Sequence, residues 1–555
     1  MTEEAPNDEF SIHWIEDVVE EVLQRNEDQY LLNAGKSPSA SIHVGILREL
    51  IICDVIKREL LKRGEKARTM LIIDDFDPVR SFPSSVSLDL EEWAGIPYSD
   101  VPDPFGCCKS FGAHWANELA NTFSDFGVDP EVVYNSDIYE TEEMRDVIRT
   151  CLQKTDTIKE IMIEYVAKDF NDEQRETYLE SMKTWSPVSV VCPKCGRLQA
   201  GVKGEIVPNR VTIYDQERDT VSFECPACGL SDTLPIAEVR MKLSWRIDWP
   251  AKWYIYKVSC EPAGKDHSVK GGSYDTGLEI SRKVFGWCGP VKVPYEWVRI
   301  GGRDMSTSEG IVFIPKTWLD IAPPELYRFL MLKTDLARAI NIQPDRIPDM
   351  VDEFDRFERI FFGFEEVADD QKELSKILYP LSTARSLDEG YVPKLPFKFA
   401  ALTAQLEGTI GKEAMIERSK NVLMKLHNLD HVSDLALQLM EKRLHQARGW
   451  VEMFGSERDK VRIPDVVPQE IRSTFAEADR NFIVAFADVL RSGEMDDDDI
   501  QAAAFEKARD VGIKEKRAFL ILYRILISQK FGPRLGPFIN LLGREWVASR
   551  LESVL

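Results

Sequence analysis

Apolar residues recur with a helical period at the start of the chain, and short apolar runs alternate with helical segments after it. Residues 11–26 predict an amphipathic helix capped by Ser11, whose apolar face is formed by Trp14, Ile15, Val18, Val19, Val22 and Leu23. The next predicted elements are a strand at 29–32, a loop of small residues at 34–45, a helix to about residue 62 and a strand at 70–73 that runs into Asp74 and Asp75. This order of strand, loop, helix and strand is a βαβ unit, which predicts a parallel sheet.

The character of the pattern changes after about residue 320. Before that point, three more apolar runs predict strands of the same sheet, at 132–134, 255–258 and 297–300. After it, the helical period dominates, and helices are predicted at 325–334, 349–362, 411–428, 434–452, 469–493, 514–530 and 543–554. The run Asp496–Asp499 is interpreted as the solvated start of a helix. The carboxyl-terminal third of the chain is therefore predicted to be all-helical.

Composition bounds the class of protein. The chain has 555 residues, of which 44% are apolar and 30% charged, so we expect a globular protein of three or four domains. The net charge of −24 argues against a general nucleic-acid binder, although a basic groove can lie on an acidic body. We find no apolar run of about 18 residues and no signal-peptide core, so neither a membrane span nor secretion is expected. Ten cysteines with metal-type spacing favour a reducing, cytoplasmic location.

Two C-x-x-C pairs, each followed by glycine, carry the most specific chemistry. Cys192 and Cys195 form the first pair, and Cys225 and Cys228 form the second. Four thiolates in this arrangement suit tetrahedral zinc and leave no open position for a substrate, so the predicted ion is structural. Short strands are predicted between the pairs, which makes the segment a zinc ribbon. The alternative is two unrelated pairs of buried cysteines.

Loops of small and polar residues suggest a ligand site. The loop from Lys36 to Gly45 ends where a helix begins, and a helix amino terminus beside a close-packed glycine is an anion site. The loops 261–267, 271–277 and 301–310 place glycines next to Asp, His and hydroxyl residues, which permits close approach of a ligand. A capping histidine or a flexible surface loop would produce each of these patterns when taken alone.

Several of these segments resemble a known family. His43-Val-Gly45 resembles the HIGH signature of class I aminoacyl-tRNA synthetases, and Met305-Ser-Thr-Ser308 resembles their KMSKS loop. The full set of motifs is similar to the class I lysyl-tRNA synthetases of archaeal type, over residues 11 to 555. The matching segments begin at Pro38, Asp75, Pro102, Trp245, Glu261, Gly272 and Gly532.

The resemblance implies a fold and a division into domains. The fold is an α/β Rossmann-type catalytic core with zinc-binding insertions, followed by an all-α carboxyl-terminal domain. The expected parts are the first core segment at 1–187, the zinc ribbon at 188–235, the second core segment at 236–320, a stem-contact region at 321–390 and a helical anticodon-binding domain at 391–555.

The resemblance also implies a reaction. L-Lysine would attack the α-phosphate of ATP, which is bound with magnesium, to give lysyl-adenylate, and the lysyl group would pass to lysine tRNA. Positioning and charge stabilisation carry such a reaction. The implied catalytic residues are His43, Gly45, Met305, Ser306 and Ser308; those for ATP are His43, Gly45, Gly264, Asp266 and Ser306; those for lysine are Gly35, Ser37, Trp245, His267 and Tyr295.

A second zinc site is also implied by the resemblance. The positions of the family's ligands hold Asp103, Cys107, Cys108 and His114, and zinc accepts such a mixture of oxygen, sulfur and nitrogen. From spacing alone, an apolar cysteine pair beside a surface histidine is favoured. With the resemblance, two structural zinc ions are expected in all.

The signature loops depart from the family pattern. Asp304 and Glu309 stand where the family supplies lysines, and carboxylates repel a triphosphate. Ile46 replaces the usual Asn and Ala40 the usual Gly. Two hypotheses follow: an active lysyl-tRNA synthetase with a compensated loop, and a catalytically impaired paralogue that binds tRNA or lysine. A third is a zinc-ribbon interaction module on an unrelated helical protein.

Overall fold

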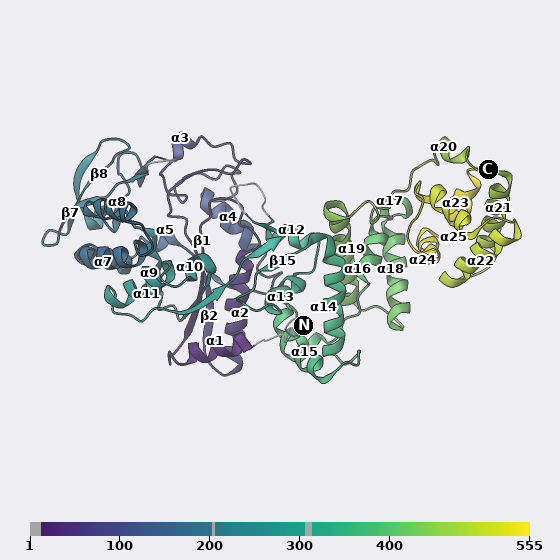
Figure 1. The fold of residues 1–555 in the computed structure, drawn as a ribbon, viewed down its shortest axis with the longest axis horizontal. Helices are drawn as coiled ribbons and strands as arrows, with labels where there is room; N and C mark the ends of the chain where they lie inside the picture. The colour runs from purple at the N-terminus through teal and green to yellow at the C-terminus, as the bar shows by residue number, and fades with distance from the viewer. Residues whose placement is uncertain (1–12, 202–205, 306–312) are drawn as a thin grey trace. The chain divides into compact units, whose positions relative to one another are not determined.

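The computed structural model describes residues 13–201, 206–305 and 313–555 (Figure 1). The chain forms two compact units, which are treated separately. The first unit comprises Met1–Thr317, Tyr327–Ile342 and Asp369–Ser386, and the second comprises Trp318–Leu326, Gln343–Ala368 and Leu387–Leu555. The finer division into five parts stays a prediction. Within the described residues, no helix is both long and apolar enough to cross a membrane.

A five-stranded parallel sheet forms the centre of the first unit. Its order is β12-β11-β1-β2-β3, with bounds Val291–Tyr295, Cys260–Gly264, Tyr30–Lys36, Ala67–Ile73 and Glu131–Tyr134. The sequence order runs outward from β1 in both directions, so the connections change direction between β1 and β11. In sheets of this kind ligands bind at that point, beyond the carboxyl ends of the strands.

Helices cover both faces of this sheet. Helix α2 (Ile46–Lys62) packs on β1, β2 and β11, and α1 (His13–Leu23) packs on α2 and β12. Side chains alternate between the two faces of a strand. Leu31, Met70 and Ile72 belong to an apolar cluster whose described residues include none from α1 or α2. That cluster includes residues from α6 (Glu142–Gln153), α7 (Thr155–Val166), α9 (Trp245–Tyr256) and α11 (Ser273–Lys283).

The predicted βαβ unit is confirmed, but two later strands are not where we expected them. Residues 255–258 form the end of α9 and the left-handed turn at Lys257, and the strand begins at Cys260. Aromatic residues suit a strand and a buried helix equally, which explains the error. Residues 298–300 form β13, but it pairs with β14 (Arg303–Asp304) and β15 (Ile340–Ile342) in a separate sheet. The strand missed, β12, contains Pro294, which an edge position tolerates.

The cysteine-rich segment forms the predicted short strands. Antiparallel β4 (Val188–Val190) and β10 (Met241–Leu243) lead into and out of it. Between them, β7 (Val211–Asp215), β8 (Thr220–Glu224) and β9 (Ser231–Pro235) form an antiparallel sheet. Val221, Phe223 and Cys225 are buried in the same apolar cluster as the central sheet. The insertion is thus packed into the core of the first unit.

The described secondary structure of residues 397–555 is helical, as predicted. Its helices include α18 (Lys412–His427), α19 (Asp434–Phe454), α20 (Gln469–Arg472), α21 (Glu477–Arg491), α22 (Asp497–Asp510), α23 (Glu515–Ile527), α24 (Leu535–Leu542) and α25 (Arg544–Glu552). The single helix predicted at 469–493 is divided, because the Asp479 carboxylate accepts the Ala476 N–H and caps a new helix. Asp496 caps α22 through the N–H groups of Asp498 and Asp499, which confirms the interpretation of the acidic run.

Candidate active site

A cavity of about 830 Å³ opens at the carboxyl ends of the central strands. Lys36 and Ser37 border it at the end of β1, Asp74 and Asp77 after β2, and Gly264 at the end of β11. The cavity therefore lies where the strand order reverses, as expected for a ligand site in such a sheet. The start of the insertion also lines it, through Ser189, Leu198 and Gln199 among others.

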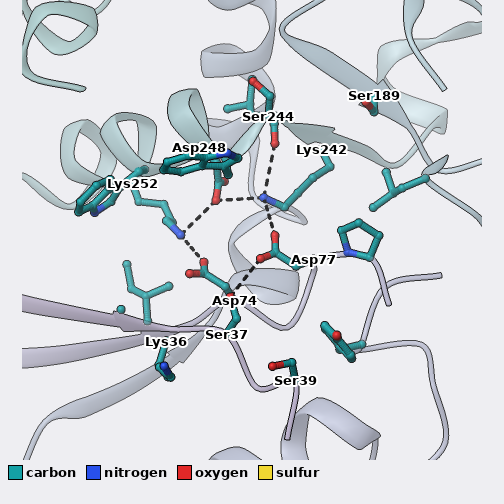
Figure 2. A pocket seen from close by; sticks show the side chains of 18 of the residues that line it. Lys36, Ser37, Ser39, Asp74, Asp77, Ser189, Lys242, Ser244, Asp248 and Lys252 are labelled. Atoms are coloured by element: carbon teal, nitrogen blue, oxygen red, sulfur yellow. Dashed lines mark hydrogen bonds and ion pairs between the residues drawn. The ribbon is translucent and has the colours of Figure 1, made fainter. Parts of the chain in front are cut away.

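Three carboxylates and two lysines form a connected network in the wall of this cavity (Figure 2). Asp248, on α9, forms ion pairs with Lys242 at 3.0 Å and with Lys252 at 3.1 Å. Lys252 also pairs with Asp74, and Lys242 lies 3.4 Å from Asp77. Burial opposes ionisation of Asp248, but the two ammonium groups outweigh it and hold the pKa of this carboxyl well below its ordinary value.

Deeper in the cavity, Glu261 accepts three hydrogen bonds. Asn33 Nδ2 and Trp253 Nε1 each donate to Oε2 at 2.7 Å, and Trp249 Nε1 donates to Oε1 at 2.6 Å. The side chain is 2% exposed, and burial raises the pKa of Glu261 to about 7 although the three donors lower it. Of these two indole rings only that of Trp249 lines the cavity, and an aromatic ring next to a carboxyl group suits an aliphatic cation.

Four of the five residues predicted to bind lysine line the cavity, namely Gly35, Ser37, Trp245 and His267. Trp245 is 46% exposed, and its ring centroid lies 6.0 Å from that of His267. His267 Nδ1 shares a hydrogen bond of 2.8 Å with Ser273 Oγ. Tyr295 does not line the cavity itself, but its hydroxyl donates to Glu49, which does.

The predicted ATP residues His43 and Gly45 lie outside this cavity, at the start of α2. The Gly45 N–H donates to His43 Nδ1 at 3.1 Å, so the proton of the neutral ring is assigned to Nε2. Burial and the charge of Lys36 lower the pKa of His43 to about 4, and the ring is therefore neutral near pH 7. A Cβ at Gly45 would lie 2.8 Å from this ring, which explains the need for glycine.

Of the other predicted residues, the structure describes Met305, Gly264 and Asp266. Met305 Cε would lie 3.4 Å from the same Cβ, so the start of the KMSKS-like loop is beside His43. Gly264 lines the cavity, and Asp266 follows it in the short helix α10 (Lys265–Ser268). Ser306, Ser308 and Glu309 lie outside the described residues.

Comparison with known proteins decides the family. A model described as tRNA synthetases class I (K) matches residues 12–385. The lysine–tRNA ligase of Methanocaldococcus jannaschii is 32% identical over 549 residues, which cover 97% of this chain and 99% of that protein. The chain belongs to the class I tRNA synthetase family. This synthetase is also 32% identical to the lysine–tRNA ligase of Thermococcus kodakarensis, over 98% of this chain and 99% of that protein.

A weaker likeness exists to a solved structure. A glutamate tRNA ligase from Elizabethkingia meningosepticum, in complex with its amino acid, aligns over 95% of this synthetase and 99% of its own chain. The identity is 12% and the TM-score is 0.40. The prediction of a class I aminoacyl-tRNA synthetase with a parallel-sheet core and a helical carboxyl-terminal part is confirmed by the family match and the fold.

Both predicted metal-ligand sets of the synthetase are brought together. Cys192, Cys195, Cys225 and Cys228 place their sulfur atoms within 4.8 Å of one another, with Cys192 Sγ 3.6 Å from Cys228 Sγ. Such a closed set of sulfur atoms fits a tetrahedral ion. The ligand atoms of Asp103, Cys107, Cys108 and His114 also lie within 4.8 Å of one another. The Asp103 carboxylate there already accepts the N–H groups of residues 105, 107 and 108.

Sequence reasoning missed the charged network. Lys242 and Lys252 carry no motif of their own, and Asp248 entered only as part of the segment Trp245–Pro250. A usable signal was present, because a lysine and an aspartate spaced four apart lie on one face of a helix, as Asp248 and Lys252 do. The contact with Lys242 has no such local signal, since it depends on a strand that ends before α9 begins.

The Glu261 hydrogen bonds predict the effect of removing one acceptor. Glu261→Gln replaces an oxygen with an NH2 group that must face an indole or amide donor, and an unpaired buried donor costs about 1–3 kcal/mol. We expect the free energy of unfolding to fall by that amount, seen as a lower midpoint of thermal unfolding, and lysine binding in calorimetry to weaken. Glu180→Gln, at a side chain 70% exposed, is the control and should change neither. Equal stability of Glu261→Gln and the natural chain would contradict this account of the site.

The two clusters predict metal content. Elemental analysis of freshly purified protein is expected to give about two zinc ions per chain. Cys225→Ser should lose one ion and destabilise the insertion, whereas Cys288→Ser, at an exposed cysteine outside both clusters, should keep both. Protein purified without zinc would refute both assignments. Loss of the ion by Cys288→Ser as well would refute the ligand set.

Proposed function

We propose that this synthetase attaches L-lysine to lysine tRNA in two ATP-dependent steps through a lysyl-adenylate. The observation that carries the proposal is the cavity itself, where aromatic rings of α9 and carboxyl groups from β11 and from the loop after β2 suit an aliphatic amino acid with two amino groups. Relatives that match almost the whole chain are named lysine–tRNA ligases, which supports the same reaction. The comparisons give no support to the impaired paralogue.

In the first step, a lysine carboxylate oxygen attacks the α-phosphorus of ATP, and the bond to the leaving pyrophosphate breaks. Neutral His43 donates from Nε2 to a phosphate oxygen, and Gly45 lets the backbone at the start of α2 approach it. Trp245 and His267 hold the aliphatic stem of lysine, while Gly35 and Ser37 contact its polar end. In the second step a ribose hydroxyl of the terminal adenosine attacks the lysyl carbonyl and AMP leaves.

The remaining assignments complete the proposal. Gly264 and Asp266 contact the adenosine of ATP, which enters with magnesium, and Met305, Ser306 and Ser308 belong to the loop that closes over the phosphates. Tyr295 acts through Glu49 at the border of the lysine site. The two metal clusters hold structural zinc. The helical part of the chain binds the anticodon region of the tRNA, and the reaction takes place in the cytoplasm.

Because the signature loop carries a carboxylate at position 304, we expect a lysine there to raise the rate of adenylate formation. Asp304→Lys restores a positive charge beside the leaving pyrophosphate and should speed adenylate formation by about a hundredfold. The gain should appear in the rate more than in ATP affinity, because the contact is strongest in the transition state. Pyrophosphate exchange with lysine, ATP and tRNA measures both quantities. Glu160→Lys adds the same charge on α7 and serves as the control.

One outcome of that experiment would favour the non-catalytic alternative. In that outcome, lysyl-adenylate is formed neither by the natural chain nor by the Asp304→Lys, Glu309→Lys double variant, with or without tRNA. Ile46 and Ala40, which are both buried, would become the next residues to replace. Lysine or tRNA binding without activation would identify the impaired paralogue.

The proposed tRNA partner predicts a steep salt dependence of binding. Each phosphate contact releases counterions. The logarithm of the affinity of the full chain for lysine tRNA should therefore fall linearly with the logarithm of the salt concentration, with a slope set by the number of phosphate contacts. Arg524→Ala and Arg534→Ala, in the helical part, should each weaken binding and reduce the slope by about one. Arg282→Ala, with a side chain 65% exposed in the first unit, is the control. A slope unchanged by both variants would refute these contacts.

A further inference from the structure

Lys242 reaches the lysine site from the strand that returns from the insertion. It lies in β10, where it pairs with Ser189 of β4, and it is 5% exposed. After β10 the chain enters α9, which supplies Trp245 and Asp248 to the cavity wall. The ammonium group of Lys242 points across the cavity wall toward Asp77 and Asp248 (Figure 2).

Lys242 and Ser37 bind opposite oxygens of the same carboxylate. Lys242 Nζ lies 3.4 Å from Asp77 Oδ1, and Ser37 Oγ donates to Asp77 Oδ2 at 3.2 Å. Asp77 comes from the loop after β2, and its side chain is 31% exposed. With one oxygen paired to the buried lysine, the plane of the carboxylate is oriented so that its other oxygen faces Ser37.

This arrangement determines what the serine offers to a ligand. A hydroxyl has one proton and two lone pairs, and the Ser37 hydroxyl donates its proton in a hydrogen bond to Asp77. Only lone pairs are left toward the cavity, and these accept hydrogen bonds from an ammonium group. A Ser37 hydroxyl released from Asp77 would rotate and would offer a donor as readily as an acceptor.

We propose that Lys242 is a positioning residue for lysine binding: by holding Asp77 it keeps the Ser37 hydroxyl oriented as an acceptor for a substrate ammonium group. The inference rests on the proposed function, since it concerns the same site. It also gives the insertion a part in substrate binding, because its return strand carries Lys242. Lys252 is the natural comparison, since it pairs with Asp74 and Asp248 and makes no ion pair within 4 Å of Asp77 among the described residues.

The test is a double-substitution cycle on the full chain. Pyrophosphate exchange gives the KM for lysine, the KM for ATP and kcat for Lys242→Met, Ser37→Ala and the double variant. We expect Lys242→Met to raise the KM for lysine on the order of tenfold and to leave the KM for ATP within about twofold. In the Ser37→Ala background the same substitution should raise the KM for lysine by less than about twofold, because coupled residues are not additive.

Two further variants keep the test decisive. Asp77→Asn, at a partly exposed side chain, should reproduce the rise in the KM for lysine if Lys242→Met fails to fold. Lys242→Arg keeps the charge and should recover at least half of the affinity lost in Lys242→Met. Lys183→Met, at a lysine 69% exposed, is the control and should behave as the natural chain.

The outcomes separate the inference from the proposed function. Additive effects of Lys242→Met and Ser37→Ala, or equal changes in the KM values for lysine and ATP, would assign Lys242 a structural role and overturn the inference alone. An unchanged KM for lysine in Asp77→Asn would also overturn it. If the natural chain bound no L-lysine in calorimetry, the proposed function and this inference would both fail.

Discussion

The site depends on one buried carboxylate that several separate segments must satisfy. Asp248 accepts from Tyr139 at 2.5 Å and from Asn135 at 3.2 Å, in addition to the two lysines of the cavity. These partners come from the segment after β3, from β10 and from α9. An ionised carboxylate cannot stay buried without such partners, so their positions are mutually constrained. The shape of the cavity follows from that constraint.

Beyond the carboxyl end of β1, the side of the site near Asp74 and Asp77 and the side near α2 differ in charge. This difference suits two substrates of different charge. On the side of Asp74 and Asp77 the wall carries more carboxylates than lysines, and a cation is favoured there. On the side of α2, His43 is neutral because burial and Lys36 lower its pKa to about 4, and the helix terminus favours an anion. This separation of charge suits the proposed reaction, in which a cationic amino acid meets the anionic phosphates of ATP.

Local sequence patterns predicted the parts of the fold that depend on local physics. The βαβ unit, the strands of the cysteine-rich segment and the longer helices of the carboxyl-terminal part were predicted, because period, caps and ligand spacing are properties of short segments. The helices α6, α7, α9 and α11 of the first unit were not predicted. Strand β12 was missed because its place at the sheet edge, which tolerates Pro294, is set by tertiary pairing. The ion network was missed for the same reason, since Asp77 and Lys242 are brought together only by the folded chain. The family resemblance supplied the roles of Ser37 and His267, which no pattern contains.

Stability alone does not account for charges in the cavity wall. Apolar residues of similar volume often replace buried ion pairs without loss of stability, because desolvation offsets much of the attraction. What apolar residues cannot do is fix the rotation of a neighbouring carboxylate or the direction of a hydroxyl proton. Asp77 and Ser37 need both, and Lys242 is the cation placed 3.4 Å from Asp77. The network therefore specifies the hydrogen-bonding character of the cavity surface, which decides whether a small charged substrate meets donors or acceptors there.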